Sequence, residues 1–541
     1  MLNKVWFWMV VGSIMVAIGL DVWDVGSNRY KNRVPFEASF IGSDSTLEQG
    51  MEKRNGVIRV SQSYYHSFYR TESEISTPSI ELPAYTLAKP GTAEGSIYIL
   101  KKHPLMPARW KSIAETQSKE SQYMIGRITM NRLSDGQAEW SVKLSFQDIY
   151  FVKMRLVVDR LLEMADTAVM IAIGLIGIMA IWLGIMRVAQ EAGLINLIAR
   201  FVRPAVKLLF PELPPDHPAV GHIVMNISAN VLGLGNAATP FGLKAMNELE
   251  KVNPHPGTAT NPMITFLAIN TAGLTMIPTQ VIAIRAAMGS QNPTIIIMAS
   301  FIAASMATLV GISCAKILER IPAFRDPTNP PMVPLTKLAL YILPFFILLY
   351  GGLFLLHMLI GIEGIKTVFS LISVLAIPLI FAVFLIYGYL KKVKIYDMVI
   401  EGAKEGFDVA VRIIPYLVAM LVAIAVFRAS GCMDLLSKVL RPLTNLIGMP
   451  SEVLPMALMR PLSGSGSIGI MTELISVHGP DSFIGLMASA FYGSSETTFY
   501  ILALYYGVVN IKNIRHSLWT GLISEAAGIL TAVFICHILF G

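Results

Sequence analysis

Charged residues are scarce in this chain of 541 residues: Asp, Glu, Lys and Arg make up 15% of it, whereas 54% of the residues are hydrophobic. Soluble domains carry about 25% charged residues. The chain therefore has too little charge to cover several globular surfaces, which excludes a cytosolic enzyme and a disordered scaffold. Most of the chain is therefore expected to lie within a lipid bilayer.

Cysteine is also scarce, with Cys314, Cys432 and Cys536 alone, all in or beside apolar runs and without a CxxC spacing. This pattern indicates neither a disulfide framework nor a metal site, and we expect no cofactor. The formal net charge is +7, but the Lys and Arg residues stand mostly at the ends of apolar runs. That placement is typical of membrane topology and not of a nucleic-acid-binding face.

Apolar runs are abundant. A helix needs about 20 mostly apolar residues to cross the hydrocarbon core. The run near the N-terminus lacks a small-residue cleavage site, so we expect an anchor helix and not a removed signal peptide. Nine runs are expected to span the membrane: Val5–Leu20, Thr167–Met186, Pro262–Ile284, Pro293–Ala315, Leu338–Ile362, Thr367–Leu390, Phe407–Phe427, Ser482–Gly507 and Ser517–Phe540.

Two further segments, Ala219–Leu243 and Val453–Thr472, are apolar but contain glycines, small polar residues and a proline. Free backbone groups at membrane depth are tolerated only where they are buried in protein or face a water-filled cavity. We therefore predict that both segments are broken or re-entrant helices.

Residues 22–155 differ from the rest of the chain, because they are polar and contain short alternating runs such as Gly56–Val60 and Trp140–Phe146. This composition predicts a small soluble, β-rich domain. Basic clusters follow the second, fourth and sixth spans, which the positive-inside rule assigns to the cytoplasm, although Arg428, Lys438 and Arg441 do not fit. We expect a multi-pass protein of the bacterial cytoplasmic (inner) membrane with an extracytoplasmic domain at 22–155.

The two halves of the chain contain similar segments in the same order. Each has a long span, an amphipathic stretch with Arg-Pro (Arg203-Pro204 and Arg441-Pro442), a broken Gly-rich segment, an interrupted span and a closing span. If the broken segments return to the side they entered, the halves are inverted repeats, as in many secondary transporters. If they span, the repeats are parallel. A duplicated bundle that merely packs well is the structural alternative.

The alternating run Ser463–Ser467 is a candidate binding element in the second half. Glycine lets the backbone unwind, and the free amides of a half-helix N-terminus favour an anion or a strongly polar group. Arg460 places a cation beside this break. An arginine within the membrane marks either a substrate contact or an internal ion pair.

Uncharged polar residues dominate the corresponding segment of the first half. Asn226 and Asn230 are four residues apart and share a helix face. Amides and hydroxyls suit recognition of hydroxyl, amide or heterocyclic groups, while interhelical hydrogen bonding is the equally weighted alternative.

Glu496 is the sharpest single candidate, in the run Gly493–Thr498. A carboxylate near the middle of a span is a usual site of proton or cation coupling, or else it pairs with Arg460. Glu473 and Glu525 are weaker candidates, because they lie nearer the ends of their segments. The matching span of the first half carries the polar residues Asn270, Thr271, Thr279 and Gln280. The predicted solute-binding residues are Asn226, Asn230, Gly235, Asn236, Thr239, Asn270, Arg460, Ser463, Gly464, Ser465, Ser467, Glu496 and Thr497.

The sequence offers no catalytic residue, because no His or Asp has a spacing that places it as a base beside the many serines. An intramembrane hydrolase is therefore the weakest alternative, and we expect that the protein is not an enzyme.

Long motifs carry a resemblance to known families. The first half, through GLIGIMAIWLGIM and MNISANVLGLGNAATPFGLKAM, resembles spore maturation protein A; the second half, through RPLSGSGSIGI and GSSETTFYILALYYGVVNIKNIRHSL, resembles spore maturation protein B. The chain thus looks like a fusion of the two. Each half is similar to the "nucleoside recognition" or gate domain, which is similar in turn to segments of concentrative nucleoside transporters and of the ferrous iron transporter. The resemblance implies an integral membrane protein with a role in transport.

The expected fold is an all-α integral membrane protein with two inverted gate-domain repeats that contain broken or re-entrant helices, plus a small soluble, β-rich extracytoplasmic insert. Its expected parts are an anchor helix (1–21), the insert (22–155), a first repeat (156–320), two connecting spans (335–395) and a second repeat (400–541). The expected function is transport of a small polar solute, nucleoside-like or an organic ion, with H⁺ or Na⁺ as coupling ion. The lipid bilayer is the expected partner. The sequence leaves open whether the chain forms a homo-oligomer. The alternative is a non-transporting module that acts in envelope or spore-type maturation through its outer domain.

Overall fold

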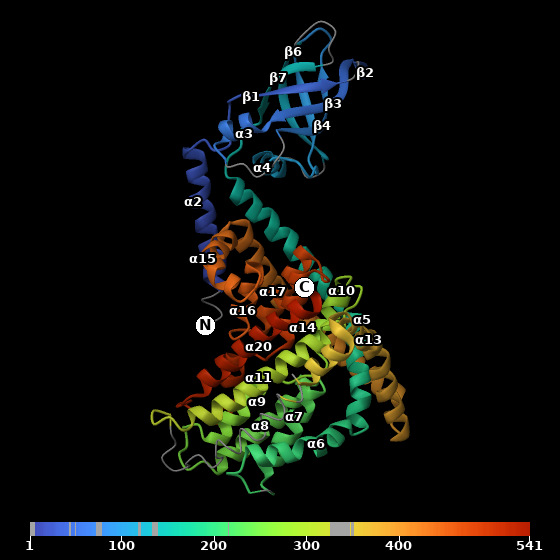
Figure 1. Ribbon diagram of the computed structural model, residues 1–541, viewed down its shortest axis with the longest axis vertical. Helices are drawn as coiled ribbons and strands as arrows, with labels where there is room; N and C mark the ends of the chain where they lie inside the picture. Colours follow the sequence, from blue (N-terminus) through green and yellow to red (C-terminus); the bar gives the residue numbers. More distant parts are fainter. Residues whose placement is uncertain are drawn as a thin grey trace. The chain divides into compact units, whose positions relative to one another are not determined.

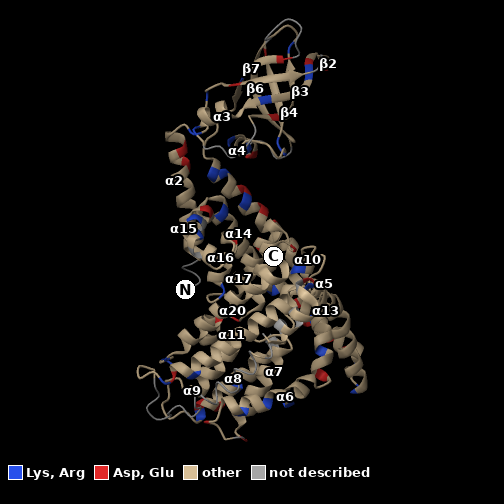
Figure 2. Ribbon diagram, in the orientation of Figure 1, with Lys and Arg blue, Asp and Glu red and all other residues tan. Residues whose placement is uncertain are grey.

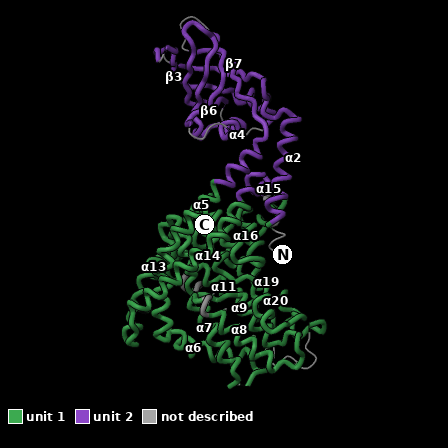
Figure 3. Tube along the Cα trace, turned by 180° about the vertical axis from the view of Figure 1, so that it is seen from behind, with its two compact units in different colours: residues 1–6, 163–424, 435–541 green, residues 7–162, 425–434 purple. Residues whose placement is uncertain are grey.

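The computed structural model describes residues 6–42, 45–48, 50–71, 78–116, 121–132, 139–214, 216–324, 347 and 351–541. The chain forms two compact units, which Figure 3 shows in different colours. One unit comprises residues 7–162 and 425–434, and the other comprises residues 1–6, 163–424 and 435–541. Each unit is described by itself.

The first unit contains a closed antiparallel β-barrel (Figure 1). Six strands follow one another around it in the order β1, β7, β6, β5, β4 and β3, and β1 also pairs with β3. Phe40 of β1 is opposite both Trp140 of β7 and Ile58 of β3. Because the first strand joins both neighbours, those six strands have no open edge. The strands are β1 (Phe36–Gly42), β2 (Thr46–Glu48), β3 (Met51–Ser61), β4 (Ser79–Ala88), β5 (Glu94–Leu100), β6 (Tyr123–Arg132) and β7 (Glu139–Phe146), with β2 added at the side of β3.

The barrel has a hydrophobic core of its own. Along β4 the buried positions alternate with exposed or half-buried ones, so that Ile80 and Leu82 point inward. Two short helices complete the core, α3 (Gln62–Tyr69) and α4 (Ala108–Thr116), and Trp110 of α4 is fully buried. The expectation of an all-α protein is therefore wrong: the period-two alternation between residues 36 and 146 builds a complete β-domain, because it buries one side chain of every two.

A carboxylate joins the two helices that flank the barrel in this unit. Helix α2 (Ser13–Gly26), preceded by the π-helical turn η1 (Trp8–Gly12), carries Asp21 near its end. The two oxygens of Asp21 accept hydrogen bonds from the amides of Lys153 (2.9 Å) and Met154 (2.8 Å). These amides belong to the first turn of α5 (Val152–Glu191), where they have no partner within the helix. Asp21 therefore caps α5 from a different helix.

The second unit is helical, and α9 (Asn261–Ala272) lies at its centre. All twelve residues of α9 are buried, and α9 packs against α11, α20, α19, α7 and α8. The other helices from α6 onward are α6 (Leu194–Leu209), α7 (Pro218–Val231), α8 (Gly235–Lys251), α10 (Thr279–Ala287), α11 (Ile296–Leu318), α13 (Gly352–Leu390), α14 (Ile395–Ala429), α15 (Cys432–Leu446), α16 (Leu454–Met459), α17 (Gly464–His478), α18 (Phe483–Gly493), α19 (Thr498–Val508) and α20 (Ser517–Phe540), with the short 3-10 turn η3 (Ser451–Val453) before α16.

Six helices among the described residues are long and apolar enough to cross a membrane, and Figure 2 shows how few charges interrupt them. Two expected spans are instead split: Pro262–Ile284 into α9 and α10, and Ser482–Gly507 into α18 and α19. Within the expected span Leu338–Ile362, residues 338–346 and 348–350 lie outside the described residues, and α13 begins at Gly352. The six segments are Trp8–Gly26, Val152–Glu191, Ile296–Leu318, Glu363–Leu390, Ile395–Ala429 and Ser517–Phe540.

Candidate functional site

Four breaks interrupt pairs of consecutive helices in the second unit. They lie between α7 and α8 (232–234), between α9 and α10 (273–278), between α16 and α17 (460–463) and between α18 and α19 (494–497). The first two breaks contain a glycine in the left-handed region, Gly233 with φ of 80° and Gly273 with φ of 57°. Glycine reaches this region without the steric cost that a side chain would impose.

The breaks satisfy one another's backbone groups. The amide of Met276, in the second break, donates to the carbonyl oxygen of Val231 at the end of α7 (2.9 Å). The amide of Glu496, in the α18–α19 break, donates to the carbonyl oxygen of Thr271 at the end of α9 (2.7 Å). Groups that a helix would otherwise pair are thus bonded within the protein, as backbone at membrane depth requires. The approach is close, since a Cβ on Gly273 would lie 2.7 Å from Cγ of Glu496.

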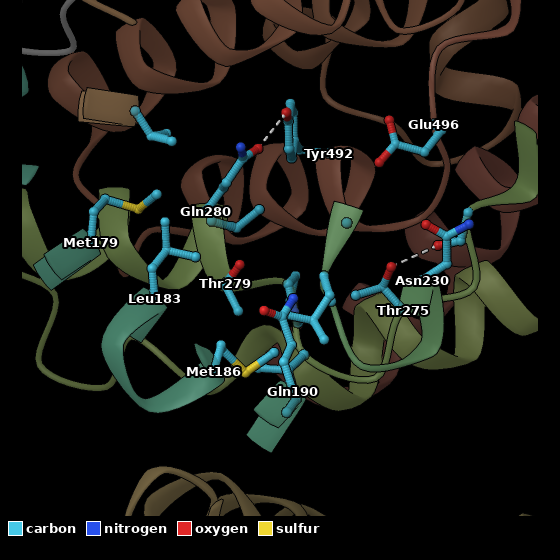
Figure 4. Close-up of a pocket in the computed structure, with 18 of the residues that line it drawn as sticks. Met179, Leu183, Met186, Gln190, Asn230, Thr275, Thr279, Gln280, Tyr492 and Glu496 are labelled. Carbon is cyan, nitrogen blue, oxygen red and sulfur yellow. Dashed lines mark hydrogen bonds between the residues drawn. The ribbon is translucent and has the colours of Figure 1, made fainter. Parts of the chain in front are cut away.

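A cavity of about 430 Å³ lies beside three of these breaks. This volume falls within the range of about 300–1,000 Å³ that small-molecule sites occupy. Figure 4 shows apolar side chains of α5 on one side of the view and the polar side chains of Asn230, Thr275 and Glu496 on the other. The described lining residues are Met179, Leu183, Met186, Arg187, Gln190, Ile195, Asn230, Gly233, Leu234, Phe241, Gly273, Thr275, Ile277, Pro278, Thr279, Gln280, Val281, Glu405, Val409, Tyr492, Gly493, Ser495 and Glu496.

Glu496 presents an exposed carboxylate to this cavity. Two other charged residues line it, Arg187 and Glu405, and Arg187 is ion-paired with Glu401 at 2.7 Å. The charge of Glu496 is therefore available to a solute or an ion. Among the described residues, no three His, Cys, Asp or Glu side chains gather as a metal-ligand set.

Arg460 lies behind the α18–α19 break and does not line the cavity as described. Its guanidinium is buried, sits 4.4 Å from the ring centre of Tyr492 and donates to the carbonyl oxygens of Tyr492 (3.0 Å) and Ser495. It also donates to Oγ1 of Thr497 (3.3 Å). Arg460 therefore holds the backbone before Glu496 and the side chain of Thr497 after it.

The Ser-Gly run forms the start of α17 and packs against the same break. Ser463 caps the helix by accepting a hydrogen bond from the amide of Gly466 (2.9 Å), as N-cap serines do. A Cβ on Gly464 would lie 3.2 Å from Oγ1 of Thr497. The amide of Phe499 completes the contact by donating to the carbonyl oxygen of Pro461 (3.1 Å). Ser465 and Ser467 bond within this turn, to Ser463 Oγ and the Ser463 carbonyl oxygen respectively.

The predicted asparagines form a buried relay that ends at the cavity. Nδ2 of Asn226 lies 3.4 Å from the hydroxyl of Tyr505, which donates to Oδ1 of Asn270 (3.3 Å). The same oxygen accepts from Nδ2 of Asn230 (3.3 Å), and Asn230 lines the cavity. The relay crosses between α7, α9 and α19.

Of the thirteen predicted binding residues, Asn230 and Glu496 are among the described lining residues, as are Thr279 and Gln280, two polar residues of the matching span in the first half. Gly235 and Asn236 form the start of α8, and Thr239 lies one turn further along that helix. Sequence reasoning missed Tyr505 and the α5 methionines Met179 and Met186, which stand in apolar runs without any local signal. It also missed Tyr492, although this residue lies directly before the glycine that opens the Glu496 run.

Apolar helices long enough to cross a membrane, together with a polar cavity at mutually bonded helix breaks, define an integral membrane protein. The family described as "Gate: Nucleoside recognition" matches residues 172–321 and 410–512, the two ranges that contain the four breaks. Because its relatives match over most of their own lengths, the chain belongs to the family of spore maturation proteins A and B.

Two relatives from Bacillus subtilis (strain 168) each match a part of the chain. Spore maturation protein B is 48% identical over 170 residues, which are 31% of this chain and 96% of the relative. Spore maturation protein A is 46% identical over 156 residues, 29% of this chain and 78% of the relative. Inner membrane protein YjiG of Escherichia coli (strain K12) is 30% identical over 81 residues, 15% of this chain and 53% of YjiG. The resemblance to a fusion of A and B is confirmed, and no solved structure matches the chain.

Proposed function

We propose that the protein is a secondary transporter or permease for a small polar solute, which binds in the cavity between the broken helices. The observation that carries this proposal is the exposed carboxylate of Glu496 in a cavity where the α9–α10 and α18–α19 breaks cross. Transporters commonly bind solutes and coupling ions at discontinuous helices, whose unwound backbone and half-helix termini face the site.

Glu496 is the proposed coupling group for H⁺ or Na⁺, because it is the cavity carboxylate that stands on a helix break. Arg460 is a positioning residue: its hydrogen bonds to the backbone at Tyr492 and Ser495 fix the loop that presents Glu496. The protein performs no covalent chemistry in this proposal.

The proposed location is the bacterial cytoplasmic membrane, with the β-barrel on its outer side. The name of YjiG, an inner membrane protein, supports the membrane, and the basic clusters after the second, fourth and sixth expected spans support the orientation. The lipid bilayer is then the partner of the apolar helices.

The proposal is tested with the purified full chain in liposomes, under an imposed H⁺ or Na⁺ gradient, against a panel of nucleosides, amino acids, organic anions and organic cations. Uptake of at least one solute is expected in the native protein and in Glu363→Gln, whose side chain is 85% exposed and outside the cavity. Gradient-driven uptake is expected to disappear in Glu496→Gln. Absence of uptake across the whole panel contradicts the proposal.

A second candidate function is a non-transporting module of envelope maturation that acts through the barrel. Its support is the closed barrel with a separate core, together with the names of the two spore maturation relatives. In a strain that lacks the gene, this function predicts that a chain without residues 34–147 fails to complement while Glu496→Gln complements. Transport predicts the reverse.

A further inference from the structure

The geometry points to a zwitterion as the solute: a small molecule with an anionic group, a cationic group and an apolar substituent, as in an apolar amino acid. This inference rests on the proposed transport function and names the class of solute. It follows from three features of the cavity: helix N-termini at one place in its wall, a carboxylate with a helix C-terminus at another, and an apolar surface on α5.

Two helix N-termini meet at the cavity. Helices α8 and α10 begin after Leu234 and Pro278, and neither N-cap residue supplies a side-chain hydrogen bond to the first turn. The two starts are neighbours, since a Cβ on Gly233 would lie 2.6 Å from the carbonyl oxygen of Ile277. Amides of a first helical turn lack partners within the helix, and the helix dipole places about half a positive charge there. This region favours a carboxylate or another anionic group.

A buried hydroxyl supports a ligand at this cavity independently of the helix termini. Ser495 lines the cavity and is only 4% exposed. Within the described part of the chain, its Oγ atom has no hydrogen-bond partner. A buried hydroxyl without a partner is costly, so a solute that bonds to it recovers a hydrogen bond that the protein alone does not make.

The negative region of the cavity is formed by Glu496 and the end of α9. Gly273 caps the C-terminus of α9 and lines the cavity, and its Cα is so close to Glu496 that a Cβ there would meet the Glu496 side chain. The carbonyl end of a helix carries about half a negative charge, which adds to the carboxylate. This region favours an ammonium or another cationic group.

The third region is the part of the α5 wall that carries apolar side chains, next to Gln190 and to Arg187, which is ion-paired with Glu401. Met179, Leu183 and Met186 of α5 face the cavity, and flexible methionines adapt to apolar groups of different shape. A simple anion would meet Glu496, and a simple cation would meet two helix N-termini. A neutral nucleoside would pair with neither charged region. A zwitterion with an apolar substituent complements all three surfaces.

The first test is a thermal-shift assay of the full chain in detergent, because a ligand that binds the folded state raises its apparent stability. The probes are L-leucine and L-methionine, then N-acetyl-L-leucine without the ammonium group, L-leucinamide without the carboxylate, and uridine and adenosine. We expect leucine or methionine to raise the melting temperature and the single-charge and neutral compounds to leave it unchanged. Equal shifts with nucleosides or with N-acetyl-leucine, or no shift with either amino acid, overturn the inference.

Two variants assign the charged groups to their regions. Glu496→Gln is expected to abolish the preference for leucine over N-acetyl-leucine, whereas Glu363→Gln, an exposed carboxylate outside the cavity, retains it. Ser495→Ala is expected to weaken leucine binding. An unchanged preference in Glu496→Gln contradicts the inference, and the comparison of probes on the native protein decides the case if a variant fails to fold.

Liposome uptake separates this inference from the proposed function. If uridine or an organic anion is accumulated while no zwitterion binds, transport stands and the zwitterion is wrong. If nothing on the panel is bound or accumulated, both proposals fail.

Discussion

Arg285 of α10 and Asp481, in the loop between α17 and α18, form an ion pair of 2.9 Å. The guanidinium of Arg285 is completely buried and also donates to the hydroxyl of Ser290 (3.1 Å). Helix α10 supplies Thr279 and Gln280 to the cavity wall. The pair therefore connects a wall of the cavity to the segment that leads into α18.

Removal of the Asp481 carboxylate is expected to destabilise the helical unit. Asp481→Asn leaves a buried guanidinium without its counter-ion, and because Asp481 is 41% exposed the cost is about 1–3 kcal/mol and below that of a fully buried pair. The measurement is the melting temperature of the full chain in detergent. The matched control is Glu363→Gln, whose carboxylate is 85% exposed. Equal melting of Asp481→Asn and the control contradicts the role of the pair.

The same pair predicts a dependence on pH. Burial raises the pKa of Asp481, but the Ser290 hydroxyl, the Gln291 amide and the charge of Arg285 lower it by more, so the pKa lies below its usual value. Below about pH 4 the unfolded chain binds the proton more readily, and the stabilisation is lost as the pH falls through the folded pKa.

The melting difference between the native chain and Asp481→Asn is therefore expected to stay constant from about pH 8 to 5 and to shrink below about pH 4. The measurement is a series of melting curves for both proteins. A difference that grows on acidification would have the wrong sign for this account.

Gly273 is expected not to tolerate a side chain. Gly273→Ala forces an alanine to φ of 57° and brings its Cβ to 2.7 Å from Cγ of Glu496, which costs about 1–3 kcal/mol for the backbone alone. Melting of the full chain measures the loss, and solute binding reports the displacement of Glu496. Gly177→Ala in α5 is the matched control, because the added Cβ meets no atom within 4 Å. A Gly273→Ala chain as stable as this control would contradict the close approach.

Asp21 is expected to hold the first turn of α5. Asp21→Ala removes both acceptors for the amides of Lys153 and Met154 and is expected to cost about 0.5–2 kcal/mol, as loss of a helix cap does. Hydrogen exchange of these two amides measures the effect directly and is expected to accelerate. Asp21→Asn retains one side-chain oxygen, so its exchange rates are expected to fall between those of the native chain and those of Asp21→Ala. Unchanged exchange in Asp21→Ala would show that the cap is dispensable.

Local chemistry predicted part of the site. Glu496 stands in a run of small polar residues within an otherwise apolar segment, and Asn230 stands beside the first glycine-rich break. Both residues were therefore predictable from the sequence around them. The role of Arg460 was not predictable, because whether its guanidinium faces the cavity or the back of the break depends on how α16 packs on α18. Tyr505 and Met179 join the site only through the packing of α19 and α5.

The fold, too, was predictable only in part from local sequence patterns. Alternating runs such as Trp140–Phe146 indicated strands, and the structure has β7 there. Closure depends on the pairing of β1 with β3 and with β7, and contacts between distant segments leave no periodic signal in either strand. The sequence predicted a β-rich insert at this place, but the all-α description of the whole chain was wrong, because the insert forms a closed barrel with a hydrophobic core.

Asn32, just before the first strand of the barrel, bonds to Ile149, just after the last strand. Its side-chain amide donates to the carbonyl oxygen of Ile149 (2.8 Å), and its side-chain oxygen accepts from the amide of the same residue (3.0 Å). Next to this contact, Arg33 and Asp148 form an ion pair of 2.8 Å. The chain thus enters and leaves the barrel at neighbouring residues, so a link of a few glycines from Arg33 to Asp148 is expected to span the gap that removal of residues 34–147 would leave. Because Val152 of α5 belongs to the core cluster of the barrel, such a removal also uncovers the first turn of that helix.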